Sequence, residues 1–393
     1  MPGPLQGVTV VAIEQAVAAP FATRQLADLG ARVIKIERPG SGDFARSYDT
    51  TVKGMSSYFV WLNRSKESLT LDLKKPEARE ALTRLLAKAD VFVENLAPGA
   101  GDRLGLGGAA WQARYPRLIA CSVSGYGPSG PYASKKAYDL LVQSEVGLIS
   151  LTGTEAHPSK VGISVADIAA GMYAYSGILT ALFARTSSGR GAVLSVSLFD
   201  ALGEWMSAPA YYTAYGGAAP RRSGAHHASI APYGPYETRE GGPVYLAIQN
   251  AREWARFCGE VLRQPALENA ERFRANVDRV RHRQELDHEI ANVFGQLTAA
   301  DVVARLDSAG IANARLGAIG DFVDHPQLRS RDRWREIESP AGRLRALLPP
   351  VEMAGVAPVM GAVPSLGQHT DAILTELGFG ADTIDAWRRE GTI

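Results

Sequence analysis

The chain is short of cysteine and has no excess of charge of either sign. Its 393 residues include only two cysteines, Cys121 and Cys258, which cannot make a disulfide scaffold. The 42 Lys and Arg residues are balanced by 41 Asp and Glu residues, so no global electrostatic field attracts nucleic acid or anionic lipid. These shortages argue against a disulfide-rich secreted module and against nucleic acid as a partner.

The sequence also lacks the hydrophobic signals of secretion and membrane insertion. The N-terminus has no basic start followed by a long apolar stretch, so we predict no signal peptide. The longest uncharged run, residues 168–184, is close to the lower length limit for a membrane span, and Asp167 and Arg185 flank it. Gly, Ser, Thr and Tyr interrupt this run, so a buried helix explains it better. We therefore expect a soluble cytoplasmic protein without membrane contact.

Several common catalytic motifs are absent as well. The sequence has no G-x-S-x-G, H-E-x-x-H, G-x-x-x-x-G-K-[ST] or paired C-x-x-C, so hydrolase, zinc and P-loop classes lose their usual support. Gly125, Gly127 and Gly130 match G-x-G-x-x-G, but Pro128 and Pro131 prevent a helix from starting inside that loop. We therefore expect no metal and no tightly bound cofactor.

What the sequence does have is enough length for two domains and a repeating α/β pattern. Residues 8–13 and 32–37 are β-branched runs, and the helical stretch 20–29 between them ends at Gly30. A strand, a helix and a strand make a βαβ unit, which implies a parallel sheet. Further strands are expected at 69–73, 91–94 and 118–122, with helices at 76–89 and 110–114. The N-terminal half therefore predicts an open α/β sheet.

The pattern changes in the second half of the chain. Residues 207–242 are rich in Tyr, Gly, Pro and His with little periodicity, which is typical of a linker or loop. Strands at 244–248 and 312–317 and a helix at 365–377 follow. We predict the N-terminal part of a large domain at 1–205, a linker at 206–228, a small domain at 229–320, and a return linker with a C-terminal helix that rejoins the large domain at 321–393.

Asp167 is the most informative single residue. It follows the small residues 162–166 and begins the uncharged helix. One interpretation is a helix cap, because an Asp side chain accepts hydrogen bonds from the free N–H groups there. The other interpretation is chemical. A helix N-terminus favours the ionised carboxylate and the apolar helix excludes water, which would keep Asp167 a nucleophile near neutral pH.

Eight blocks spread over nearly the whole chain resemble, in order, the class III CoA-transferases, a family typified by formyl-CoA:oxalate and carnitine CoA-transferases. The resemblance implies an α/β fold with a Rossmann-like large CoA-binding domain, a smaller α/β domain and an interlinked homodimer. The blocks are VIKIERPGSGD (33–43), NRSKESLTLDLKKPEA (63–78), VFVENLAPGAGDRLGLG (91–107), SGYGPSGPYASKKAYDLLVQ (124–143), the Asp167 segment, SGRGAVLSVSLFDA (188–201), IAPYGPYET (230–238) and PSLGQHTDAILTELG (364–378).

The resemblance implies that Asp167 is the catalytic nucleophile. Its carboxylate would attack the thioester of an acyl-CoA, giving a mixed anhydride and free CoA thiolate. The thiolate would then attack the aspartyl carbonyl, releasing the donor acid and leaving an aspartyl-CoA thioester that an acceptor carboxylate resolves. The negative tetrahedral centres need N–H donors. Gly241 and Gly242 are candidates for covering the intermediate, although the alternative for both is an ordinary turn.

CoA is expected as a substrate, and its 3′-phosphate and pyrophosphate need several cations. Gln15 and Ala16, after the first strand, fall where the family contacts the pantetheine end of CoA. Lys135 precedes Lys136, so the assignment of that cation is open by one position, and a solvated surface charge is the alternative for each cation. Carried over residue by residue, the resemblance points to Gln15, Ala16, Arg38, Leu71, Lys74, Asn95, Leu96, Arg103 and Lys136.

Other functional classes remain open. The α-methylacyl-CoA racemases share the fold and a related aspartate but transfer a proton, which needs an acid/base group on each face of the α-carbon. In the racemases a His precedes an aspartate where this chain has Tyr138 and Asp139, and an unperturbed Tyr, with a pKa of about 10, is a poor base at neutral pH. A non-catalytic CoA-binding protein is a third class, and the intact Asp167 argues against it.

The acids that exchange CoA also stay open. Glu14, beside Gln15, is a candidate for contact with the acyl group. Two arginines and two histidines near the linker either bind the second carboxylate of a short dicarboxylic acid, such as succinate, itaconate or mesaconate, or form a basic surface loop. These are Arg221, Arg222, His226 and His227.

Overall fold

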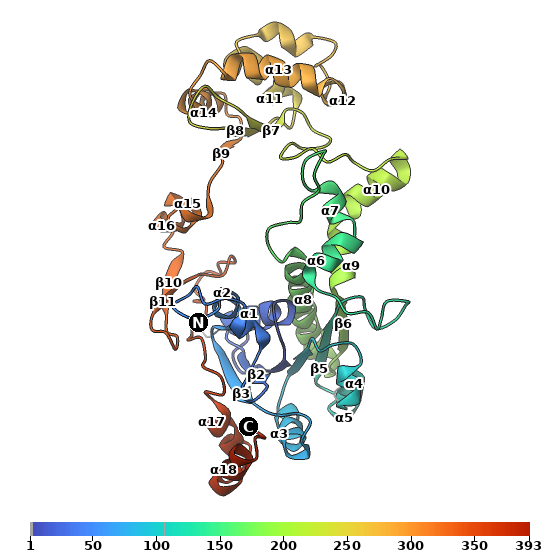
Figure 1. The fold of residues 1–393 in the computed structure, drawn as a ribbon, viewed down its shortest axis with the longest axis vertical. Coiled ribbons are helices and arrows are strands. Elements are labelled where there is room, and N and C mark those ends of the chain that lie inside the picture. The colour runs from blue at the N-terminus through green and yellow to red at the C-terminus, as the bar shows by residue number, and fades with distance from the viewer. Residues whose placement is uncertain (1–2, 106) are drawn as a thin grey trace. The chain divides into compact units, whose positions relative to one another are not determined.

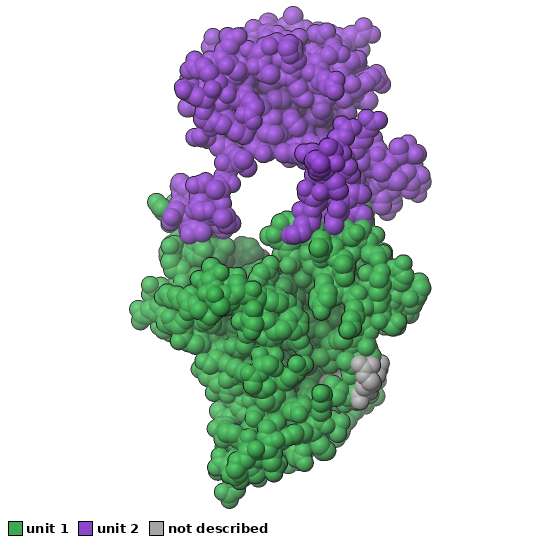
Figure 2. All heavy atoms as spheres, in the orientation of Figure 1, with its two compact units in different colours: residues 1–146, 161–207, 329–393 green, residues 147–160, 208–328 purple. Residues whose placement is uncertain are grey.

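The computed structural model describes residues 3–105 and 107–393 and divides into two compact units. Unit 1 contains the segments up to residue 146, 161–207 and 329–393, whereas unit 2 contains 147–160 and 208–328 (Figure 2). Unit 1 is therefore made of three separate stretches of chain. The domain boundaries proposed above stay a prediction.

A six-stranded parallel sheet forms the centre of unit 1 (Figure 1). The strand order is β3-β2-β1-β4-β5-β6, and all five neighbouring pairs are parallel. This is the order of a doubly wound sheet, whose ligand crevice lies where the order reverses, here between β1 and β4. The predicted α/β fold with a parallel sheet is confirmed. The strands are β1 (Thr9–Ile13), β2 (Arg32–Glu37), β3 (Lys66–Thr70), β4 (Val91–Glu94), β5 (Ile119–Ser124) and β6 (Val193–Ser197).

The buried side chains explain where the strands lie. In β1, Val10, Val11 and Ala12 are fully buried, as expected for a parallel sheet covered on both faces. Strand β3 is different, because its buried residues include the polar Lys66 and Ser68. The sequence pattern predicted this strand three residues too late, at 69–73, because it looked for apolar residues where buried polar groups begin the strand.

Helices from distant parts of the chain pack around this sheet. Helices α1 and α8 are in close contact: a Cβ atom on Gly171 would lie 2.7 Å from the carbonyl oxygen of Ala18, so this approach requires glycine. The remaining elements of unit 1 are η1 (Phe44–Ser47), α2 (Ser57–Asn63), α3 (Pro76–Leu86), α4 (Ala100–Arg103), α5 (Gly108–Arg114), α6 (Asp139–Glu145), α9 (Leu198–Trp205), β10 (Trp334–Ile337), β11 (Leu344–Leu347), α17 (Thr370–Glu376) and α18 (Ala381–Arg389), beside α1 (Ala18–Asp28) and α8 (Val165–Ser188).

Among the described residues, one helix, α8, is long and apolar enough to cross a membrane by length and composition. Its apolar character has a packing role here, because Ala170, Ala174 and Ile178 are fully buried and the helix packs against α1, α6, α9, β5 and β6. Near its C-terminal end, Arg185 forms a 2.8 Å ion pair with Asp90. The opposite face is open, with Phe183 79% exposed, so the predicted buried helix is buried on one side only.

The C-terminal segment completes the core of unit 1. His369 accepts a 3.1 Å hydrogen bond at Nδ1 from the Ser68 N–H, and the Thr370 hydroxyl accepts one of 3.0 Å from the Thr70 N–H. Phe379 and Trp387 then join the same apolar cluster as the sheet residues. The helix predicted at 365–377 begins only at Thr370, because the residues before it pair with β3.

Unit 2 has its own core around a three-stranded antiparallel sheet in the order β7-β8-β9. The aromatic residues Trp254, Phe257 and Phe294 are buried there. The stretch 207–242, predicted as loop, contains a ten-residue helix and a strand. The elements from 147–160 and 207–330 are α7 (Leu148–Leu151), α10 (Ser207–Gly216), β7 (Tyr233–Tyr236), β8 (Val244–Ala247), α11 (Ala251–Arg256), η2 (Phe257–Val261), η3 (Pro265–Asn269), α12 (Asn276–Arg281), α13 (Arg283–Phe294), α14 (Ala299–Ser308), β9 (Asn313–Arg315), α15 (Ile319–Val323) and α16 (Pro326–Ser330).

Candidate functional site

Two predicted site residues meet at the point where the strand order reverses. Gln15 follows β1 and Asn95 follows β4, its neighbour in the sheet. The Gln15 N–H donates a 2.9 Å hydrogen bond to Asn95 Oδ1, and the Asn95 side-chain amide donates a 2.8 Å bond to the Gln15 carbonyl oxygen. This reciprocal pair joins the ends of the two strands at the crevice where doubly wound sheets bind ligands.

The next residue, Ala16, adopts an unusual backbone conformation. Its φ of 61° lies in the left-handed region, which a residue with a Cβ atom rarely enters. The Ala16 N–H donates a 3.1 Å hydrogen bond to Asp43 Oδ1. Gln15 and Ala16 therefore form a turn that is held by side chains from two other loops at the same edge of the sheet.

The other predicted contacts after β2, β3 and β4 lie at this carboxyl edge too. Arg38 and Lys74 are exposed, whereas Leu96 is half-buried. Leu71 is 2% exposed and its side chain packs in the core, so only its backbone is available to a ligand at this edge. The side chain of Arg103, at the end of α4, lies outside the described residues, so its predicted contact stays a prediction.

The choice between Lys135 and Lys136 can be argued from their surroundings. Lys135 pairs with Glu145, and its Nζ lies 4.4 Å from the centroid of the Tyr132 ring. Lys136 is exposed and has no hydrogen bond or ion pair within the described part of the chain. A cation already engaged by a carboxylate and an aromatic ring is less available to a phosphate, so this geometry is compatible with Lys136, whose contact with CoA stays a prediction.

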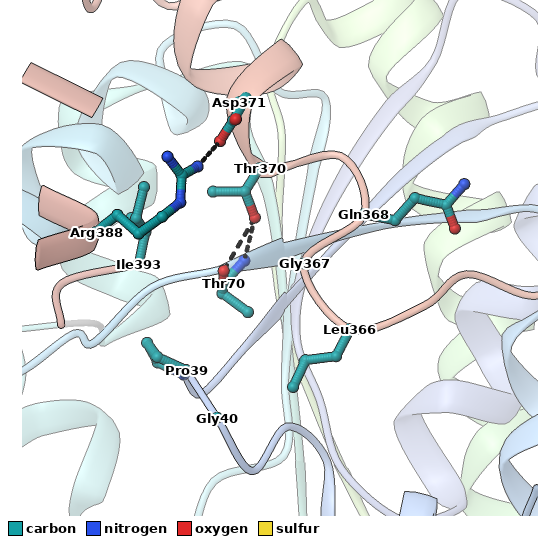
Figure 3. A pocket seen from close by; sticks show the side chains of 10 residues that line it. All are labelled: Pro39, Gly40, Thr70, Leu366, Gly367, Gln368, Thr370, Asp371, Arg388 and Ile393. Atoms are coloured by element: carbon teal, nitrogen blue, oxygen red, sulfur yellow. Dashed lines mark hydrogen bonds and ion pairs between the residues drawn. The ribbon is translucent and has the colours of Figure 1, made fainter. Parts of the chain in front are cut away.

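A cavity of about 410 Å³ adjoins these contacts (Figure 3). Pro39 and Gly40, directly after Arg38, line one part of it, and Thr70, directly before Leu71, lines another. The rest of the lining belongs to the C-terminal segment. It consists of Leu366, Gly367, Gln368, Thr370, Asp371, Arg388 and Ile393.

Asp167 lies in the first turn of α8, but it does not cap that helix. The cap comes from Asp139, whose Oδ1 accepts a 2.7 Å hydrogen bond from the Ala166 N–H. Gln143 holds Asp139 in place by donating a 2.6 Å bond to Oδ2. No hydrogen bond or ion pair of the Asp167 carboxylate occurs within the described part of the chain. The capping interpretation is therefore wrong for Asp167, and its carboxylate is available for chemistry.

The surroundings of Asp167 favour its neutral form. Burial, and secondarily the like charge of Asp139, raise the pKa of the Asp167 carboxyl to about 7. This direction is opposite to the sequence expectation, which considered only the stabilising helix N-terminus. A carboxyl with a pKa near 7 is partly ionised at neutral pH, so a nucleophilic carboxylate is still present.

Tyr48 connects the Asp167 region with the turn after β1. Burial and the charges of Asp43 and Asp167 raise the pKa of the Tyr48 phenol to about 12. Its hydroxyl therefore lies within electrostatic reach of both carboxylates, one of which holds Ala16. Tyr48, Asp43 and Asp139 were not predicted as members of this region. Asp43 and Asp139 do lie inside the quoted family blocks, which was the available signal.

If Asp167 is the nucleophile that the family resemblance implies, the rate of CoA transfer is expected to depend on pH with a midpoint near 7, because only an ionised carboxylate attacks a thioester. Plots of kcat/KM against pH would rise through this midpoint rather than near the ordinary aspartate value of 3.8. Removing the like charge with Asp139→Asn lowers the pKa of Asp167 and moves the midpoint to lower pH. Asp139→Glu keeps the charge and serves as the control. An identical midpoint in the Asn variant and the wild type would contradict the assignment.

Glu14 does not face the open part of the site. It is 1% exposed, accepts a 2.6 Å ion-paired hydrogen bond from Lys66 and accepts another of 2.6 Å from the Thr23 hydroxyl. Burial opposes its charge, but Lys66 and Lys35 together hold the pKa of Glu14 below its ordinary value. The hypothesis that Glu14 contacts the acyl group is therefore wrong, since both carboxylate oxygens are used inside the protein.

In unit 2, the four candidate cations have different surroundings. The Arg222 guanidinium donates to the backbone carbonyls of Thr154 at 2.8 Å and Glu155 at 2.7 Å, so it is already satisfied. The His227 ring stacks on Tyr233. His226 Nδ1 is buried and has no hydrogen-bond partner among the described residues. A carboxylate-binding role is therefore least compatible with Arg222.

The glycines proposed to cover the intermediate lie between β7 and β8. Gly241 and Gly242 have φ values of 92° and 81°, which only glycine adopts easily. The Gly241 carbonyl oxygen accepts a 2.8 Å hydrogen bond from Arg315. These facts describe a well-defined turn, and contact with the intermediate remains a prediction.

Comparisons with known proteins agree with the resemblance. A model of CoA-transferase family III matches residues 5–370. The chain is 33% identical over 384 residues to the succinyl-CoA:glutarate CoA-transferase of Mus musculus, covering 95% of this chain and 86% of the mouse protein. It is 34% identical over 332 residues to the acetyl-CoA:oxalate CoA-transferase of Acetobacter aceti, covering 84% and 85% of the two chains.

The fold is also similar to solved structures. A crystal structure of a CaiB/BaiF family protein from Brucella suis superimposes with a TM-score of 0.82 at 32% sequence identity. The match covers 96% of this chain and 100% of the Brucella chain. The similarity therefore includes the residues of both units and is not confined to the parallel sheet.

Proposed function

Because the chain belongs to CoA-transferase family III, we propose that it moves CoA from an acyl-CoA donor to a carboxylic acid acceptor through a thioester on Asp167. The observation that carries the mechanism concerns two aspartates, Asp139 at the start of α6 and Asp167 in the first turn of α8. Asp139 caps the helix, and the Asp167 carboxylate is left without an internal partner among the described residues. A partly buried carboxylate without an internal partner is a candidate nucleophile.

The proposed steps exchange acyl and CoA groups at this carboxylate. An Asp167 oxygen attacks the donor thioester carbonyl, the C–S bond breaks, and CoA leaves as a thiolate from a mixed anhydride. The thiolate attacks the aspartyl carbonyl, and the donor acid leaves as a carboxylate. The acceptor carboxylate then repeats both steps in reverse order, so no net proton, water or electron is consumed. Two easier substitutions on each side replace one direct exchange between two carboxylic acids.

We propose short dicarboxylic acids as substrates. The names of the two relatives above include succinate, glutarate and oxalate, each of which has a second carboxylate, with acetyl-CoA as the donor named for the Acetobacter protein. Arg221 and His226 remain candidates for that carboxylate, whereas Arg222 is already satisfied. A panel of acyl-CoA donors against mono- and dicarboxylic acceptors, read by mass spectrometry of the CoA products, tests this. Equal transfer to butyrate and to glutarate would contradict the dicarboxylate preference.

The proposed CoA site runs along the carboxyl edge of the sheet, from Arg38 past the cavity to the turn at Gln15. Arg38, Lys74 and Lys136 are exposed and available for phosphates. The Gln15–Ala16 turn and Tyr48 surround the region that the pantetheine thiol must reach. This arrangement supports the residue assignments carried over from the family.

Replacing Arg38 or Lys136 with Ala is expected to raise the KM for acyl-CoA about tenfold and to change kcat much less. A phosphate contact far from the reacting carbon stabilises the ground state and the transition state nearly equally. Steady-state kinetics at fixed acceptor concentration measures both constants. Arg190→Ala, an exposed cation just before β6 at the amino edge of the sheet, is the matched control. An unchanged KM in both test variants would indicate that Arg38 and Lys136 are solvated surface charges that do not contact CoA.

We propose that the protein acts as a homodimer. Large apolar side chains are exposed on α8, β6 and α9, which pack against one another, and such a surface on unit 1 is typical of a protein–protein interface. Sedimentation velocity is expected to give a dimer at micromolar concentration. An active monomer under the same conditions would contradict the interlinked architecture. The exposed residues are Met172, Tyr173, Phe183, Val193, Phe199 and Trp205.

The racemase alternative makes a different chemical prediction. It needs a second acid/base group, but Tyr138 is 65% exposed and Asp139 is used as the helix cap. A racemase would incorporate solvent deuterium at the α-carbon of a 2-methylacyl-CoA and would form no covalent adduct. We expect the opposite: incubation with acyl-CoA alone adds the mass of CoA to the protein, and hydroxylamine removes it.

A further inference from the structure

A group of buried charges lies beneath the Gln15–Ala16 turn. Lys35, Glu37 and Asp43 all come from the VIKIERPGSGD block, and each is at most 3% exposed. Lys35 Nζ lies 2.8 Å from Asp43 Oδ2 and 3.5 Å from Glu14 Oε1. Burying this many charges is costly unless each one is paired. Each of these charges has a partner of opposite charge. Stability alone does not explain why the carboxylate of Asp43 also accepts a hydrogen bond from the turn after β1.

Asp43 is the member that reaches the site. Its Oδ1 accepts hydrogen bonds from the N–H groups of Ala16 at 3.1 Å and Ala45 at 2.9 Å. Its Oδ2 accepts from Lys35, and its own N–H donates to Glu37 Oε1 at 3.0 Å. Asp43 is therefore fixed on three sides, and its only partner in the turn after β1 is the Ala16 N–H.

Ala16 needs such a partner because its conformation is unfavourable. A non-glycine residue at positive φ persists only where the surrounding structure determines it. Asn95 fixes the backbone of Gln15, but no bond from Asn95 reaches the Ala16 N–H. The bond from Ala16 to Asp43 is thus the contact that specifies the left-handed residue.

The turn is linked through the start of α1 to α8, the helix that carries Asp167. Helix α1 begins at Ala18, two residues after Ala16, and the Ala18 carbonyl is in close contact with Gly171 of α8. Gly171 lies about one helical turn after Asp167. A change in the turn would therefore move the surroundings of the reacting carboxylate.

We propose that Asp43 is a positioning residue for CoA transfer, which fixes the Gln15–Ala16 turn against Asp167 through the Ala16 N–H. This inference rests on the proposed function. Displacement of groups near a reacting centre by about 1 Å can cost about a hundredfold in rate. The role is distinct from that of Glu37, which belongs to the same buried group but has no bond to the turn: Glu37 bonds to Arg46, Ser68 and Asp43.

The test compares Asp43→Ala with Glu37→Ala. Both remove one buried negative charge and its hydrogen-bond acceptors, so both are expected to lower the melting temperature. Only Asp43→Ala removes the acceptor of the Ala16 N–H, so only this variant is expected to lower kcat, by tenfold or more, with the KM for acyl-CoA changed less than threefold. Hydrogen exchange followed by mass spectrometry should show faster exchange of the peptide containing Ala16 in this variant only. Equal losses of kcat in the two variants, or wild-type kcat in folded Asp43→Ala, would overturn the proposal.

A second substitution separates positioning from stability. Glycine adopts positive φ without strain, so Ala16→Gly is expected to restore part of the lost kcat in Asp43→Ala and none in Glu37→Ala. If Asp43→Ala does not fold, Ala16→Val disfavours the same conformation while the ion pairs stay intact, and its wild-type kcat would overturn the proposal. A wild-type protein that forms no thioester refutes the proposed function. A thioester formed at equal rates by wild type and Asp43→Ala refutes only this inference.

Discussion

Replacing Asp167 with asparagine is expected to lower kcat for CoA transfer by more than about a thousandfold, because the variant loses the nucleophile of a covalent mechanism. The protein should still fold, since Asp139 and not Asp167 caps α8. Loss of the carboxyl also removes a group whose ionisation burial disfavours, as its pKa of about 7 indicates. The melting temperature at pH 8 should therefore be equal to or above that of the wild type.

Measurement of the intact protein mass tests directly whether Asp167 forms the thioester with CoA. Wild-type protein incubated with acyl-CoA and no acceptor should gain the mass of CoA, whereas Asp167→Asn should gain nothing. Thr186→Ala, an exposed position on the same helix, provides a control that should behave as the wild type. Full transfer activity in Asp167→Asn would place the nucleophile elsewhere.

The second large effect concerns stability. Glu14→Gln is expected to lower the free energy of unfolding by about 3–5 kcal/mol, because it leaves fully buried Lys66 and Lys35 without one of their counter-charges. The pKa of Glu14 is lowered in the folded protein, so its contribution is present at neutral pH and is lost as the pH falls through that lowered value. The difference between variant and wild type should therefore shrink in acid.

Urea denaturation followed by circular dichroism measures this difference. Glu80→Gln is the control, because Glu80 forms an exposed ion pair with Arg84 and should contribute less than about 1 kcal/mol. A Glu14→Gln variant as stable as the wild type but unable to transfer CoA would restore the hypothesis of contact with the acyl group.

Strand positions were predictable where apolar residues alone define them. β2 and β4 lie at the predicted residues: β4 contains the buried apolar run 91–93, and in β2 the buried Val33, Ile34 and Ile36 were enough to reveal the strand although a charged residue separates them. β3 was displaced in the prediction because Lys66 and Ser68 are buried through partners 30 or more residues away. No local pattern reports such distant pairs.

In the candidate site, too, some residues were predictable from the sequence and others depend on partners far away in the chain. Gln15 and Asn95 were selected by resemblance, and the structure places them in direct contact. The sequence left two roles open for Asp167, cap and nucleophile, and only the structure could assign the cap to Asp139, which lies 27 residues before the Ala166 N–H that it accepts from. Asp43 lies in the VIKIERPGSGD block, but no role was predicted for it. Its partner Ala16 is on another loop and donates through a backbone N–H, which no pattern of side chains reveals.

The three-part construction of unit 1 has a consequence for synthesis on the ribosome. Phe379 and Trp387 share an apolar cluster with Phe92 and Trp111, so that cluster stays incomplete until the last segment emerges. Translation at about 5–20 residues per second needs roughly 6–24 s to produce the intervening stretch 208–328. Throughout that time the nascent sheet has an uncovered apolar face. The newly synthesised chain should therefore depend on chaperones that shield this face. Slower translation of the codons for residues 208–328 should increase aggregation.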